Sequence, residues 1–235
     1  MSTPNVFFKS NSYLALNLEP RSEVPSAYGR HAPAITVARQ TGARGVAICT
    51  HLHQQLQQRD AKDPLPWTLF DGELSKKILQ EHHLPEYLEK FIPDEAIGEL
   101  QGTINELLGR HPSLWTLFKD TKETIARLAS TGHCILVGHG SNHIAGHLHN
   151  VLSVRLIGST AVRTRHVMDS LQLNRAQAQA LIKREDHARR SYVKQHFHCD
   201  IDDPASYDLV LRTDHWSDAG AAACIVEALE QLNPT

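Results

Sequence analysis

Short runs of β-branched and aliphatic residues alternate with longer amphipathic stretches along most of this chain. The runs that fit buried strands are 35–38, 67–70, 134–137, 152–157 and 208–211. Apolar residues spaced three or four positions apart predict helices between these runs. The expected helices follow residue 45 (Ile48, Leu52, Leu56), follow Asp71, cover most of 94–130 with a break at 109–113, and form a long charged segment from about 161 to 192.

Strands that alternate with helices in this way predict a parallel sheet with helices on both faces, which is an α/β fold. Such sheets bind ligands at the carboxyl ends of their strands. The turn at 39–45, Asp71 and the turn at 138–140 each follow a predicted strand. We therefore expect a ligand site where these three positions meet.

The bulk composition adds few constraints. With 235 residues, the chain fits one domain over 34–235, preceded by an irregular, proline-containing arm over 1–33. A net charge of −2 gives no basic excess for nucleic-acid binding. The four cysteines show no CxxC spacing, and no apolar stretch approaches the roughly 18 residues that span a bilayer. We expect a cytoplasmic protein with reduced thiols and no membrane partner.

The 16 histidines raise the question of a metal site. His139, His143 and His147 are spaced four apart and would align on a helix, with His149 close by. Zinc needs three or four converging ligands, and the glycines at 138, 140 and 146 argue against one continuous helix here. Scattered surface histidines are the favoured interpretation, and no metal-ligating residues are predicted.

The stretch "ARQTGARGVAIC" at 38–49 has the strand, glycine-rich turn and helix of a phosphate-binding loop. Gly42 and Gly45 could form the turn, and Arg39 and Arg44 supply positive charge. The sequence does not match GxxxxGK[ST], because the lysine is missing. From the residues alone, a phosphate loop and an ordinary turn remain equally open.

A second candidate is "LIKREDHARRSYVK" at 181–194. Residues three and four apart share a helix face, so Lys183, Asp186, Arg189 and Arg190 could point together. Arginines that close on a transferring phosphoryl group stabilise its transition state. A solvated charged helix with internal ion pairs is the alternative.

Taken together, the chain from Ile35 to Leu232 resembles the cytidylate-kinase-like family, a divergent branch of the P-loop nucleoside monophosphate kinases. The resemblance rests on stretches that occur in the right order: "ITVARQTGARGVAI", "LFDGELSKKI", "IARLASTGHCILVGHGSNHI", "NVLSVRLIGSTAVRTRHVM" and "IKREDHARRSYVKQHFHCDIDDPASYDLVLRT". It implies a P-loop NTPase-like three-layer α/β/α fold with a five-stranded parallel sheet and a helical lid at about 183–204. It also implies ATP and Mg²⁺ as cofactors and small-molecule nucleotides as substrates.

The resemblance also implies site residues. The cofactor-binding residues would be Arg39, Thr41, Gly42, Ala43, Arg44, Gly45 and Val46. The acceptor-binding residues would be Asp71, His139, Arg163 and Lys183. The catalytic residues would be Arg44, Asp186, Arg189 and Arg190.

Two positions depart from the family pattern. Arg44 replaces a glycine of S-R-x-x-G-S-G-G, where it could bind phosphate or block it, and His139 replaces the arginine of G-R-G. Two hypotheses follow: a kinase that phosphorylates a nucleoside monophosphate or similar small acceptor, and a catalytically impaired nucleotide-binding or regulatory protein. The intact arginine cluster favours the kinase.

Overall fold

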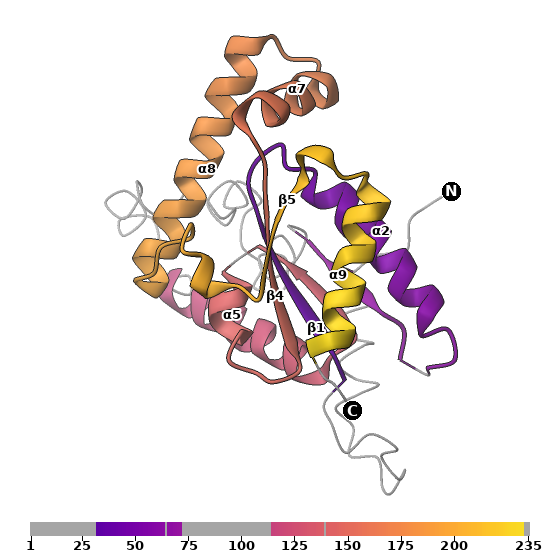
Figure 1. Cartoon of the computed structure of the whole chain (residues 1–235). Coiled ribbons are helices and arrows are strands. Elements are labelled where there is room, and N and C mark those ends of the chain that lie inside the picture. Colours follow the sequence, from indigo (N-terminus) through magenta and orange to yellow (C-terminus); the bar gives the residue numbers. More distant parts are fainter. Residues whose placement is uncertain (1–31, 64, 72–113, 139, 233–235) are drawn as a thin grey trace, which may run out of the picture.

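Five parallel strands form the centre of the molecule, in the order β2-β3-β1-β4-β5 (Figure 1). The computed structural model describes residues 32–63, 65–71, 114–138 and 140–232. The strands are β1 (Ala34–Arg39), β2 (Thr68–Phe70), β3 (Cys134–Val137), β4 (Val151–Ile157) and β5 (Leu209–Arg212). All five predicted strands are confirmed within one or two residues, and so is the three-layer α/β architecture.

Alternate strand residues point to opposite faces of the sheet, and both faces are buried. On one face, Ile35 and Val37 pack against α2 (Gly45–Arg59) and α9 (Asp218–Leu232). On the other face, Ala34 packs against α5 (Leu114–Thr131). Figure 1 shows α2 and α9 on one side of the strands and α5 and α8 on the other. The apolar side chains predicted for α2, Ile48, Leu52 and Leu56, are buried, and Ile125 and Leu128 of α5 are buried as well.

The charged segment after β4 is two helices, whereas the sequence pattern predicted one continuous helical stretch. The helix α7 (Thr160–Leu171) ends at Gln172, whose backbone is left-handed. Asn174 then caps α8 (Arg175–Phe197), because its side chain accepts the N–H of Gln177 while the Gln177 side chain accepts the N–H of Asn174. This reciprocal capping box starts a new helix. The two helices form the antiparallel hairpin at the top of Figure 1.

Further elements were not among the predicted ones. They are the short helix α6 (Ser141–Ala145), the 3₁₀ helices η2 (Pro204–Ser206) and η3 (Thr213–His215), and α9. The helices predicted after Asp71 and over 94–108, and nearly all of the predicted arm over 1–33, lie outside the described residues. No helix in the described part of the chain is long and apolar enough to cross a bilayer.

Candidate functional site

The turn after β1 is tightly constrained by its glycines. Gly42 has a φ of +79°, and a Cβ built there would lie 2.6 Å from the carbonyl oxygen of Arg163. At Gly45 a Cβ would lie 2.9 Å from Cγ of Arg39. The close approach of α7 at Gly42 and of the Arg39 stem at Gly45 therefore both require glycine.

The turn leads directly into the N-terminus of α2. The first backbone N–H groups of a helix have no intrahelical acceptor, and the helix dipole adds partial positive charge there. The N-cap residue of α2 is Arg44, and no side chain caps the helix with a hydrogen bond. This end of α2 is therefore chemically suited to bind an anion.

The side chain of Arg44 is directed toward the segment that follows β5. Its Nη1 lies 2.7 Å from Oδ1 of Asp218, and its Nη2 donates to the carbonyls of Thr213 and Trp216. The Arg44 and Asp218 side chains are 15% and 28% exposed. Both terminal nitrogens of Arg44 are thus used inside the protein, so the side chain joins the turn to residues 213–218.

Asp186 on α8 joins that helix to the same turn. Its carboxylate accepts the backbone N–H of Thr41 at 2.8 Å, Nη1 of Arg163 at 2.6 Å and Nη2 of Arg189 at 2.7 Å. Burial raises the pKa of the Asp186 carboxyl, but these donors outweigh burial and hold the pKa below its ordinary value. Asp186 is therefore an ionised carboxylate within a cluster of cationic groups.

Arg163 and Arg189 strengthen this connection. Arg163 donates to the carbonyls of Gly158 and Thr41 as well as to Asp186. Arg189 donates to the hydroxyl of Thr41 as well as to Asp186. The structure thus brings Thr41, Arg163, Asp186 and Arg189 into one cluster, although 148 positions separate Thr41 from Arg189.

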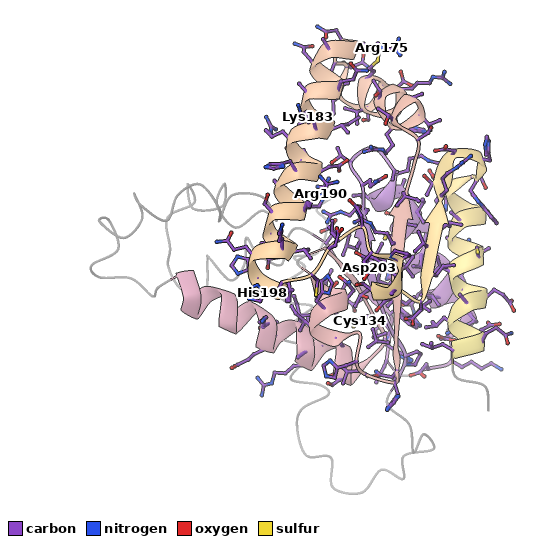
Figure 2. All side chains as sticks on the ribbon, turned by 60° about the vertical axis from the view of Figure 1, so that its left-hand side comes forward. Cys134, Arg175, Lys183, Arg190, His198 and Asp203 are labelled. Carbon is purple, nitrogen blue, oxygen red and sulfur yellow. The ribbon has the colours of Figure 1, made fainter. Side chains whose placement is uncertain are left out.

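Arg190 does not join this cluster, in contrast to the expectation that it shares a face with Asp186 and Arg189. Its Nη2 lies 2.8 Å from Oδ2 of Asp202, in the loop after α8. Lys183 is exposed and lies on the part of α8 that is nearer to Arg175 (Figure 2). The predicted cationic face of α8 is therefore divided between the turn at 39–45 and the loop after α8.

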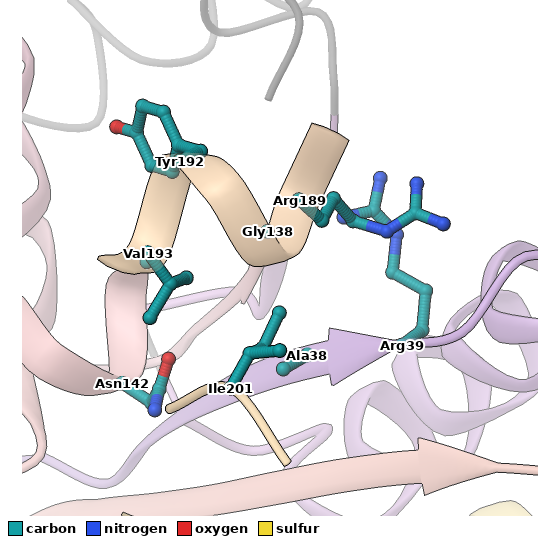
Figure 3. A pocket seen from close by; sticks show the side chains of 9 residues that line it. Ala38, Arg39, Gly138, Asn142, Arg189, Tyr192, Val193 and Ile201 are labelled. Atoms are coloured by element: carbon teal, nitrogen blue, oxygen red, sulfur yellow. The ribbon is translucent and has the colours of Figure 1, made fainter. Parts of the chain in front are cut away.

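A pocket opens between α8 and the carboxyl edge of the sheet (Figure 3). The cavity enclosed by the lining atoms is small, about 20 Å³, and the rest of the pocket is open to solvent. Arg39 reaches it from the end of β1 and Arg189 from α8. The other lining residues are Ala38, Gly138, Gly140, Asn142, Tyr192, Val193 and Ile201. Two guanidinium groups at one opening favour an anionic ligand.

Asp71 lies at the end of β2, in the neighbourhood of Arg39. Burial raises the pKa of the Cys49 thiol to about 12, and the charges of Arg39 and Asp71 act on the same thiol in opposite directions. Arg39 and Asp71 are thus both near enough to Cys49 for their charges to act on its thiol. His139, the other residue predicted to contact the acceptor, lies outside the described residues, so its role stays a prediction.

Among the residues that the structure describes, no group of three or more His, Cys, Asp or Glu side chains is arranged to hold a metal ion. His143 stacks on Phe197, with ring centroids 5.2 Å apart. Burial lowers the pKa of His143, which favours the neutral ring. In the described residues, His143 therefore packs as an aromatic side chain.

Sequence reasoning missed several residues of this region, among them Val193 and Ile201 of the pocket lining. Asn142 and Tyr192 line the pocket, and Asp218 binds Arg44. Asn142 follows the glycine turn after β3, a position at the ligand-binding edge that the topology rule could have indicated. No local signal identifies Asp218, because 174 positions separate it from Arg44.

Comparisons with known proteins bear on the family and the fold of this chain. The family model described as the cytidylate kinase-like family matches residues 34–215. No functionally curated protein matches the sequence. The crystal structure of an uncharacterised protein from Eubacterium ventriosum has a TM-score of 0.61 at 15% identity, over 84% of this chain and 98% of that one. At that identity the likeness establishes the fold alone.

Two further crystal structures are more distant. TT1252 from Thermus thermophilus has a TM-score of 0.46 at 15% identity, over 87% of this chain and all of that one. Shikimate kinase from Bacteroides thetaiotaomicron has a TM-score of 0.42 at 13% identity, over 85% of this chain and 97% of that one.

Proposed function

This chain belongs to the cytidylate kinase-like family, and on that premise we propose that it transfers the γ-phosphoryl group of ATP to a nucleoside monophosphate or similar small acceptor. The observation that supports this most strongly is the position of Arg189. It lines the pocket together with Arg39, and it also donates to the hydroxyl of Thr41 in the turn before α2. A permanently charged group from α8 thus lies beside both the turn and the pocket.

In this proposal the ATP phosphates bind at the N-terminus of α2. The backbone N–H groups of Gly42 and of 44–46 act as donors, whereas the N–H of Ala43 already donates to the carbonyl of Gln40. The helix dipole also favours negative charge there. Arg44 holds the segment 213–218 beside the turn, so the backbone and not its guanidinium contacts phosphate. In this proposal, the backbone N–H groups and the helix dipole bind the phosphates in place of the lysine of the usual loop.

Few side-chain oxygens near the turn are suited to bind Mg²⁺. Val46 follows Gly45, where a phosphate-binding loop has a serine or threonine hydroxyl for the ion. Asp71 is the carboxylate at this edge that could hold Mg²⁺, directly or through water. When bound with ATP, the ion would neutralise charge on the nucleotide phosphates.

The acceptor would occupy the pocket, with its reacting oxygen directed toward the turn. Phosphoryl transfer needs little covalent help from a protein, so positioning and charge supply most of the rate. Arg39 and Arg189 would neutralise charge on the transferring group. For Arg189 this requires its bonds to Asp186 and Thr41 to give way to the phosphoryl oxygens.

The test is ADP release from ATP with Mg²⁺ and a panel of nucleoside monophosphates. We expect turnover with at least one acceptor, and its loss in Arg189→Ala. The matched control is Arg175→Ala, an exposed arginine on the same helix, which should retain turnover. Absence of ADP release with every acceptor, at several pH values, would rule out the kinase.

One observation favours the second function, a nucleotide-binding protein with little or no catalysis. Asp186 already binds Arg163, Arg189 and the N–H of Thr41. A protein that keeps these bonds when ATP is present would bind the nucleotide without using Arg189. Calorimetry that detects ATP binding, in a sample that releases no ADP, would support this function over the kinase.

A further inference from the structure

Arg155 is a buried arginine in the middle of β4. Its neighbours along the strand, Val154 and Leu156, are fully buried in the core under α2 and α9. Arg155 therefore points to the opposite face, where α8 lies. Its side chain is only 6% exposed. An arginine in the centre of a parallel sheet needs a specific reason, because burial of a charge is unfavourable.

The contacts of Arg155 leave part of its guanidinium unused. Nη2 lies 2.9 Å from Oδ1 of Asp202, and Cζ lies 5.8 Å from the centre of the Tyr207 ring. Nε and Nη1 are buried and have no hydrogen-bond partner among the described residues. Buried N–H groups without an acceptor are rare, and such groups call for an explanation such as a ligand.

Arg155 is flanked by two residues that line the pocket. Ala38 is its direct partner on β1, so both side chains lie on the same face of the sheet. Ile201, also in the pocket lining, immediately precedes Asp202, and its carbonyl accepts the hydroxyl of Tyr207. Arg155 is not itself a lining residue, but its strand partner Ala38 and the neighbour of its ion-pair partner Asp202, Ile201, both line the pocket.

We propose that Arg155 is a substrate-binding residue whose unused N–H groups donate to an oxyanion of the acceptor. This inference rests on the proposed function, and it narrows the acceptor to small molecules that bring their own phosphate or carboxylate. A guanidinium is the group best suited to this task, because it is always charged and offers several donors in a fixed plane.

Asp202 connects this site to α8. It accepts Arg155 from the sheet and Arg190 from the helix, so one carboxylate serves two guanidinium groups. The hydrogen bond to Asp202 raises the pKa of Arg190. The charges of Asp186 and Asp200 also raise the pKa of Arg190. An acceptor oxyanion would use the remaining N–H groups of Arg155 without displacing Asp202.

The test compares wild type with Arg155→Met, which keeps the length of the side chain and removes its donors. The matched control is Arg212→Met, an arginine on the next strand that is 59% exposed. Inorganic phosphate and acetate are titrated separately into each full-length protein, to distinguish a phosphate-bearing from a carboxylate-bearing acceptor. We expect one anion to bind wild type and Arg212→Met alike, and to bind Arg155→Met at least tenfold more weakly.

A crystal structure of the full chain, soaked with whichever of the two anions binds in the titration, shows directly where that anion lies. Density for the anion within hydrogen-bond distance of Nε or Nη1 of Arg155 supports the inference. Ordered waters on both nitrogens, with the anion bound at α2 alone or not at all, overturn it. If Arg155→Met does not fold, Arg155→Gln, which removes the charge, replaces it in the titration, and unchanged affinity in that variant also overturns it.

Failure of the Arg155 inference can be distinguished from failure of the proposed kinase function. If no acceptor is phosphorylated, the kinase proposal fails, while the soaked crystals still decide whether Arg155 binds an oxyanion. If an acceptor is phosphorylated and Arg155→Met leaves its KM unchanged, the inference fails and the kinase stands. A rise of tenfold or more in the acceptor KM, with the KM for ATP changed less than twofold, supports both.

Discussion

The carboxylate of Asp186 accepts the backbone N–H of Thr41 at 2.8 Å, across 145 positions of sequence. Thr41 lies in the turn that leads into the uncapped N-terminus of α2. Backbone N–H groups in such turns are the usual ligands of phosphate. In this structure one such group, the N–H of Thr41, already donates to a carboxylate of the protein itself. Asp186 and a bound phosphate would therefore repel each other or compete for the same donors.

This relationship predicts the effect of Asp186→Asn on anion binding. The variant removes the internal negative charge beside Arg163 and Arg189. We expect inorganic tripolyphosphate to bind the variant several-fold more tightly than wild type, as measured by calorimetry. Asp169→Asn, at an exposed position on α7, controls for the loss of one negative charge. Weaker binding to Asp186→Asn would instead mean that Asp186 holds the turn in its binding shape.

The same variant predicts a pH dependence of stability. The pKa of Asp186 lies below its ordinary value of 3.8 in the folded protein. The carboxylate therefore stabilises the fold above that ordinary value, and the stabilisation is lost as the pH falls through the folded pKa. At pH 7 we expect the free energy of unfolding of Asp186→Asn to be about 1–3 kcal/mol lower than that of wild type. Urea unfolding at pH 7, 5 and 3 should show this difference shrinking with acidity, and a constant difference would contradict it.

The salt bridge between Arg44 and Asp218 predicts an energetic coupling between these two residues. Arg44→Ala and Asp218→Ala should each destabilise the protein, and the double variant should lose about 1 kcal/mol less than the sum of the two. Urea unfolding of the four proteins measures this coupling. If Arg44 bound phosphate instead, Arg44→Ala would weaken ATP binding far more than Asp218→Ala, and the coupling would be near zero.

The backbone of Arg44 predicts a difference between two variants at that position. Its φ of +61° is left-handed, which costs a residue with a Cβ about 1 kcal/mol and costs glycine almost nothing. Arg44→Gly and Arg44→Ala lose the same side-chain contacts. We therefore expect Arg44→Gly to be more stable than Arg44→Ala by about 1 kcal/mol in urea unfolding. Equal stability would show that the turn relaxes when the arginine is removed.

The sheet and the turn could be predicted from the sequence because their signals are local. Ile35 and Val37 are buried, which is why a β-branched run marks the strand. The glycines at 42 and 45 mark the turn, since neighbouring atoms leave no room for a Cβ. The break between α7 and α8 also had a local signal, the capping box of Asn174 and Gln177, which the charge pattern obscured.

The partners of the charged side chains could not be predicted in the same way. Arg189 and Arg190 are adjacent on α8, yet one binds Asp186 and the other Asp202. Asp202 lies in the loop after the helix, and its position depends on how that loop returns to the sheet. Helix periodicity describes which residues share a face, but it does not indicate which acceptor a long side chain reaches.

The final prediction concerns Gly42, where the turn meets α7. An alanine there would have to adopt the observed φ of +79° and place its Cβ 2.6 Å from the carbonyl oxygen of Arg163. We expect Gly42→Ala to lower the free energy of unfolding by about 2–4 kcal/mol, as the sum of backbone strain and steric overlap. At a temperature where the variant is still folded, tripolyphosphate binding should also weaken, since the turn must move away from α7.

Gly220→Ala is the matched control for that substitution. Gly220 lies in the first turn of α9, and its nearest neighbour is the hydroxyl of Ser217, which accepts the N–H of Gly220 and lies 3.0 Å from the added Cβ. Alanine favours a helix over glycine by up to about 1 kcal/mol, and a shift of the Ser217 hydroxyl offsets part of this gain, so this variant should change stability by less than about 1 kcal/mol. Both variants add one methyl group, and urea unfolding compares them directly. If Gly42→Ala proved as stable as Gly220→Ala, the close packing of α7 on the turn would not constrain the residue type at position 42.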